Sequence, residues 1–234
     1  MSKKRLAAGT VALSLMSSAA GVATAGTAPS PYANMAPVAQ YMMATPEEEI
    51  ALAKSAAPPS ISRDAEILVL SPHGYETAVK GKNGFVCLVE RSWNADFNDP
   101  LFWSPHIRGA DCLNPEAART IIPHYRERAN WALAGLSKAE MLARTKAEIS
   151  AHTYILPGPG AMSFMLSKEQ RLGDPISNWH PHLMFFVANA TDASWGANFD
   201  SSPVAIGVTG SDPIKTFLVP VGKWSDGTPV SNMK

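Results

Sequence analysis

Residues 114–150, NPEAARTIIPHYRERANWALAGLSKAEMLARTKAEIS, carry the clearest helical pattern in the chain. Asn114 is a typical N-cap, and the proline that follows it suits the first position of a helix. Apolar residues then recur at spacings of three and four, as one buried helix face requires. Pro123 is expected to kink this helix or divide it near Ile122, because proline lacks an N–H group and its ring clashes with the preceding turn.

A second helix is predicted directly after the first. Ser137 and Glu140 match a capping box, in which each residue satisfies a backbone N–H of the other. The apolar pattern of this helix continues to about Ser150. The two helical stretches together form a central helical block.

Strand patterns lie on both sides of this block. Residues 67–70 form a continuous apolar run, typical of a strand covered on both faces. Residues 75–79 and 85–89 alternate in polarity around the turn sequence Gly-Lys-Asn-Gly, which predicts a hairpin. Further strands are expected at 162–166, 181–187, 203–208 and 214–221. Strands before and after a helical block, without a regular βαβ repeat, predict an α+β fold with a mainly antiparallel sheet and the helical block packed on one face.

Composition excludes several classes of protein. The 234 residues include 20 basic and 20 acidic side chains, and 46% are hydrophobic. This apolar content is too high for a disordered polyelectrolyte, and zero formal charge gives no field that attracts nucleic acid. Two cysteines cannot form a disulfide-dense miniprotein or a four-thiolate zinc site.

Residues 1–25 match a secretory signal peptide. Three basic residues precede a short apolar run, and Ala23-Thr24-Ala25 provides a small-residue exit, so we expect cleavage after Ala25. A permanent membrane anchor is the alternative, but glycine, serine and threonine dilute the run too strongly. We therefore expect a periplasmic or secreted protein with no transmembrane segment after cleavage. The signal carries basic residues and no acids, so the mature chain is mildly acidic, which argues further against a nucleic-acid partner.

The mature chain divides into two parts. Residues 26–59 are rich in Ala, Pro and Met, which is typical of a tether. One short helix is expected in it, capped by Thr45 with Pro46 at its first position and Glu48 as the capping-box acid. A pair of prolines ends this helix. Residues 60–234 are predicted to form a single globular domain.

Cys87 and Cys112 are expected to form a disulfide. In an oxidising compartment, the two cysteines of a chain pair more often than they react. The alternative is an activated thiolate nucleophile beside a histidine, which needs one cysteine to be free. We favour the disulfide because the signal peptide predicts export.

Aromatic residues concentrate between the two cysteines. The loop contains Trp93, Trp103 and His106, which are candidates for a ligand-binding platform because aromatic rings stack on planar ligands. Large aromatic side chains more often serve burial. We therefore favour packing of this loop on the body of the protein.

His180 and His182 are candidate metal ligands. Alternate residues of an extended segment share a face, so the two imidazoles project together and match the ligand preference of zinc or a similar divalent ion. A catalytic zinc normally needs a third protein ligand. The candidates for it are, in order, His73, His106 and Asp174. The alternative, which we favour, is a pair of partly buried histidines without metal.

Three segments carry a family resemblance. They are residues 81–87, GKNGFVC, residues 157–162, PGPGAM, and residues 179–186, WHPHLMFF. In these segments the chain resembles uncharacterised exported bacterial proteins. The resemblance implies an envelope location and supplies no reaction, cofactor or catalytic residue.

Two functional hypotheses follow. The first is a non-enzymatic exported domain that binds a small molecule or an envelope protein. The second is a metal-dependent, hydrolase-like enzyme in which His180 and His182 hold the ion that activates a water. The sequence contains no Gly-x-Ser-x-Gly elbow, phosphate loop or His-Glu-x-x-His helix, so other common enzyme classes lack support.

Overall fold

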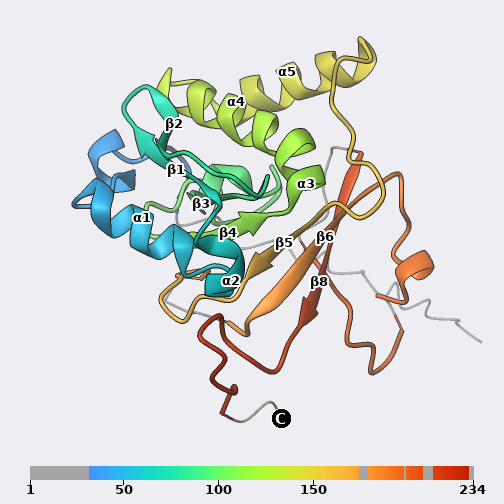
Figure 1. The fold of residues 1–234 in the computed structure, drawn as a ribbon. Coiled ribbons are helices and arrows are strands. Elements are labelled where there is room, and N and C mark those ends of the chain that lie inside the picture. The colour runs from blue at the N-terminus through green and yellow to red at the C-terminus, as the bar shows by residue number, and fades with distance from the viewer. Residues whose placement is uncertain (1–31, 174–178, 198, 208–212, 232–234) are drawn as a thin grey trace, which may run out of the picture.

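The fold is one mixed sheet with helices on both faces (Figure 1). The computed structural model describes residues 32–173, 179–197, 199–207 and 213–231. The strands are β1 (Glu66–Ser71), β2 (Gly74–Val79), β3 (Val86–Glu90), β4 (Gly109–Leu113), β5 (Met162–Met165), β6 (His182–Ala188), β7 (Ala205–Ile206) and β8 (Ile214–Pro220). The α-helices are α1 (Pro46–Lys54), α2 (Pro59–Ser62), α3 (Pro115–Thr120), α4 (Ile122–Leu133) and α5 (Lys138–Ser150). Short 3-10 helices are η1 (Val38–Tyr41), η2 (Ser92–Asn94) and η3 (Ala193–Trp195).

The eight described strands follow the order β2-β1-β3-β4-β5-β6-β8-β7. Only β1 and β3 pair in parallel, and the other neighbours are antiparallel. This topology confirms the predicted α+β fold with a mainly antiparallel sheet. All four strands expected after the helical block are present, as β5 to β8.

The predicted hairpin between 75–79 and 85–89 is wrong. The strand β2 pairs instead with β1 through a tight turn in which Gly74 has φ 109°, a conformation that favours glycine. The chain then crosses to the other side of β1, where β3 pairs in parallel. Asn83 anchors this crossing by donating a hydrogen bond of 2.8 Å from Nδ2 to the carbonyl of Ile61. Alternation specifies a buried face but not the neighbouring strand, so it could not distinguish these pairings.

Helices cover both faces of the sheet. The central helical block packs on one face, where α3 and α4 share a core with side chains of β1, β3 and β4 (Figure 1). The opposite face of the same strands is covered by α1. The core under α1 contains Leu52, Ala53, Ala56, Ile67, Cys87, Val89 and Cys112.

The helix boundaries follow the predicted caps. Asn114 Oδ1 accepts from the backbone N–H of Ala117 at 2.9 Å, and the helical block divides before Pro123 as expected. The capping box of α5 is complete, with Ser137 and Glu140 bonded in both directions. No helix of the described residues has both the length and the apolar character that crossing a membrane requires.

The packed body includes α1, which the sequence analysis placed in the tether. Thr45 caps this helix as predicted. Tyr41 is fully buried, and its hydroxyl donates to the carbonyl of Trp103 at 2.7 Å. Glu49 of α1 forms an ion pair of 2.9 Å with Arg91, and their side chains are 3% and 0% exposed. These contacts extend the folded body upstream of residue 60.

Cys87 and Cys112 form the predicted disulfide. They lie directly opposite each other on the antiparallel strands β3 and β4. Both are fully buried beneath α1, so the bond joins the two strands that flank the aromatic loop.

Candidate functional site

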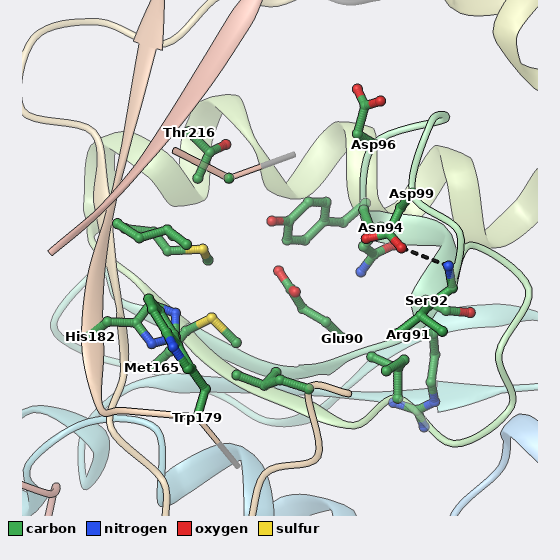
Figure 2. Close-up of a pocket in the computed structure, with 18 of the residues that line it drawn as sticks. Glu90, Arg91, Ser92, Asn94, Asp96, Asp99, Met165, Trp179, His182 and Thr216 are labelled. Atoms are coloured by element: carbon green, nitrogen blue, oxygen red, sulfur yellow. Dashed lines mark hydrogen bonds between the residues drawn. The ribbon is translucent and has the colours of Figure 1, made fainter. Parts of the chain in front are cut away.

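A pocket of about 430 Å³ lies on the sheet face that carries α3 and α4. Strands β3, β5, β6 and β8 provide its floor, while the loop after β3 and Tyr125 of α4 provide walls. Figure 2 shows the carboxyl group of Glu90 pointing into the middle of the pocket, with Met165 on one side and Asn94 on the other. A volume of this size suits a small organic ligand.

Strand register makes the floor of the pocket apolar. On β6, His182, Met184 and Phe186 alternate along the strand and share one face. Met165 of β5 lies opposite His182, and Leu218 of β8 lies opposite Met184. The side chains of Met165, Met184 and Phe186 are buried. This surface matches the hydrocarbon part of a ligand.

Glu90 is the acidic centre of the pocket. Gly109, which has no side chain, lies directly opposite Glu90 on the neighbouring strand β4. A Cβ atom at Gly109 would lie 3.4 Å from Glu90 Oε2 and 3.0 Å from Met165 Cε, so glycine keeps this space open. Glu90 Oε1 is buried and has no well-oriented hydrogen bond, although the Tyr125 phenol and the Asp111 carboxyl group lie beside this side chain. A buried oxygen without a donor is costly, and a ligand that supplies the donor would relieve that cost.

A second carboxyl group, Asp111, lies beside Glu90. Burial raises the pKa of Glu90, and the neighbouring Tyr125 phenol partly opposes that shift. Burial and the negative charge of Glu90 raise the pKa of Asp111 well above its usual value. Neither oxygen of Asp111 has a well-oriented hydrogen bond in the structure. The pair therefore favours protonation at pH values where exposed carboxyl groups are ionised.

We expect the free energy of unfolding of the Asp111→Asn variant to rise, relative to that of the wild type, as pH increases. A carboxyl group with a raised pKa binds its proton more tightly in the folded protein. The folded state therefore loses stability as pH rises from the pKa of the unfolded chain, about 3.9, toward the pKa of the folded protein. Asparagine removes this loss and keeps the shape. Urea unfolding of both proteins at pH 5, 6, 7 and 8 measures the difference. A difference that is independent of pH, or that falls as pH rises, would contradict the shifted pKa of Asp111.

His182 is a neutral hydrogen-bond acceptor at the other side of the pocket. Its Nδ1 lies 2.8 Å from the carbonyl oxygen of His180. Because a carbonyl only accepts, Nδ1 carries the proton and the lone pair lies on Nε2. Burial lowers the pKa of His182 to about 4, so the ring is neutral at physiological pH. The indole of Trp179 lies edge-on to this ring, with 4.6 Å between the two ring centroids.

The charged lining of the pocket is predominantly acidic. Glu90, Asp96 and Asp99 line it, and Arg91 is the one lysine or arginine among the described lining residues. The side chain of Arg91 is fully buried and is held by Glu49 on the other side of the sheet. Arg91 therefore has no exposed charge to offer an anionic ligand.

The aromatic loop packs into the core. Trp93 and Trp103 are 0% and 4% exposed, so these two candidate ligand-binding residues have no accessible face. His106 is exposed, and its ring lies 6.3 Å from that of Tyr32. Burial thus agrees with the packing role that we favoured for the loop, and its backbone shapes the wall of the pocket.

The structure does not bring His73 close to the pair formed by His180 and His182. His73 lies in the exposed turn between β1 and β2, whereas β3, β4 and β5 separate β1 from β6. His182 is 2% exposed, and its Nδ1 is engaged by His180. Asp174 lies outside the described residues. Within the described ranges, the group of three potential ligands that converges is a different one, on α4 and α5. Metal binding by His180 and His182 stays a prediction.

The sequence analysis did not identify Glu90, Asp111 or Tyr125 as site residues. The sequence signal was one acidic residue within each of two apolar strands. These residues are Glu90 in Val-Cys-Leu-Val-Glu and Asp111 in Gly-Ala-Asp-Cys-Leu. Acids are rarely buried without a reason, so each was a candidate. Only the pairing of β3 with β4 shows that they are neighbours.

The pocket as a whole combines an apolar floor, a buried acceptor on Glu90 and a neutral acceptor on His182. A cavity with these features can hold a molecule that has an apolar body and a hydrogen-bond-donating head group. In comparisons with known proteins, no family model, curated protein or solved structure matches the chain.

Proposed function

We propose that the protein is an exported domain that binds a small amphiphilic molecule with a cationic or hydrogen-bond-donating head group. The observation that carries the proposal is Glu90 Oε1, a buried acceptor that has no well-oriented hydrogen bond and lies within an apolar pocket. The head group would meet Glu90, and the apolar body would lie on the floor formed by Met165, Met184 and Phe186.

Charge gives the site its selectivity. An ammonium group beside Glu90 favours the ionised carboxylate and forms a charge-assisted hydrogen bond. A carboxylate ligand would instead meet acidic side chains, while Arg91 is buried in its pair with Glu49. The proposed ligands are therefore amines or donor-rich neutral molecules rather than organic anions.

Two features support the exported location. The predicted signal peptide spans residues 1–25, and the disulfide between Cys87 and Cys112 is of the kind that persists in oxidising compartments. An exported binding domain can take up a small molecule outside the cytoplasm.

The head group is tested with three probes of equal chain length: hexylammonium, hexanol and hexanoate. Hexylammonium is expected to raise the melting temperature of the protein most, and hexanoate least, because only the first places a positive donor beside Glu90. Glu90→Gln removes the negative charge while keeping the shape, and we expect it to weaken hexylammonium binding by about tenfold or more.

The matched control is Glu169→Gln, at an exposed glutamate that does not line the pocket. It should bind hexylammonium as the wild type does. The proposal would be contradicted if hexylammonium and hexanoate raised the melting temperature equally, or if Glu90→Gln bound hexylammonium as the wild type does.

A further inference from the structure

A second cluster of polar side chains lies on the helices, outside the pocket. His124 and Glu127 are three residues apart on α4 and so share a face, and Glu148 reaches them from α5. One potential ligand atom from each residue lies within 4.8 Å of the others. Figure 1 shows α5 above α4 in this view, with the chain after α5 turning back toward the sheet.

The ring of His124 is held in one orientation. Its Nε2 lies 2.7 Å from the carbonyl oxygen of Ile155, and the ring stacks on Tyr154 at a centroid distance of 4.0 Å. Because the carbonyl only accepts, Nε2 carries the proton and the lone pair lies on Nδ1. Histidines that bind metals typically donate their other N–H to such a carbonyl, which fixes the tautomer. His124 is also 8% exposed, so it is buried in this position.

Neither carboxyl group of the cluster is held in an ion pair in the part of the chain that the structure describes. One carboxylate oxygen of Glu127 lies within 4.8 Å of one of Glu148, close enough for the two charges to repel each other. The guanidinium of Arg144 lies 5.8 Å from the ring centre of Trp131. Two crowded carboxylates beside an imidazole form a strong site for a cation.

We propose that His124, Glu127 and Glu148 bind a divalent transition-metal ion of the zinc class. One nitrogen and two carboxylate oxygens suit zinc, whereas magnesium and calcium prefer sites built of oxygen alone. Three protein ligands leave a coordination position for water. The ion joins α4 to α5 and, through Ile155, steadies the chain that follows α5. This site is independent of the pocket proposed above, because neither Glu127 nor Glu148 lines that pocket.

The test is zinc binding by the full chain after removal of metals with a chelator. Equilibrium dialysis followed by metal analysis is expected to find one zinc per chain, with binding of magnesium weaker by at least about tenfold. The double variant Glu127→Gln/Glu148→Gln keeps the shape of the cluster and removes its charge. We expect it to lose at least about tenfold in zinc affinity, and zinc should no longer raise its melting temperature.

Two matched variants separate this site from other binding. Glu169→Gln removes one exposed carboxylate elsewhere and should bind zinc as the wild type does. His180→Ala alters the other candidate metal site, and we expect it to leave zinc binding unchanged. Should the double variant fold poorly, Glu148→Gln alone is measured and is expected to weaken binding in the same direction. Zinc binding that survives both glutamate variants, or that is lost in His180→Ala, overturns the proposal.

Discussion

Glu49→Gln is expected to lower the free energy of unfolding by about 3 kcal/mol or more. Glu49 accepts hydrogen bonds from Arg91 Nη2 at 2.9 Å and from the backbone N–H of Leu70 at 3.1 Å. Both charged side chains are almost fully buried. Removing one charge leaves the guanidinium of Arg91 buried without a counter-charge, which costs about 3–5 kcal/mol in comparable pairs.

The comparison that isolates this charge is Glu47→Gln, an exposed glutamate on the same helix. Both variants lose one negative charge near the positive end of α1, so only the buried pair distinguishes them. Urea unfolding at neutral pH measures the two stabilities. If Glu49→Gln were no less stable than Glu47→Gln, the ion pair would not hold α1 on the sheet.

Loss of the disulfide is expected to cost about 3–4 kcal/mol. Cys87 and Cys112 are separated by 25 residues. Closing a loop of that length lowers the entropy of the unfolded chain, which stabilises the folded state by this free energy. The double variant Cys87→Ala/Cys112→Ala avoids burying new polar groups in the core under α1. Its unfolding in urea is compared with that of the oxidised wild type.

A reducing agent provides the internal control. It should destabilise the wild type toward the double variant and leave the double variant unaffected. Thiol titration of the denatured, unreduced wild type is expected to find no free thiol. Two free thiols, or equal stability of the variant and the oxidised protein, would contradict the role of this bond.

Helix ends were predictable because their causes are local. Asn114, Ser137 and Glu140 bond to backbone groups within three residues of themselves, and Pro123 acts on its own turn. The exposed Thr45 cap follows the same rule. Such contacts need no knowledge of the rest of the fold, so the sequence pattern is sufficient.

Strand partners and the site depend on contacts between distant residues. The alternation of 75–79 fits either side of a hairpin, and the choice of β1 as partner rests on the turn at Gly74 and the anchor at Asn83. Glu90 and Asp111 meet because Leu88, two residues before Glu90, lies opposite Asp111. No spacing in the sequence encodes that register.

The proposed metal site on α4 and α5 shows the same division. His124 and Glu127 share a helix face, which their spacing of three residues predicts. Glu148 joins them only through the packing of α5 beside α4. The sequence analysis named His180 and His182 as candidate ligands instead, because alternation on a strand places two imidazoles together without a third residue.

The most direct measurement of the central claim compares the dissociation constants of hexylammonium and hexanoate by titration calorimetry on the wild type and Glu90→Gln. The claim is that Glu90 receives a donor head group inside the apolar pocket. We predict that the wild type binds the ammonium at least about tenfold more tightly than the carboxylate, and that the preference largely disappears in the variant. Equal or tighter binding of hexanoate by the wild type would contradict the claim.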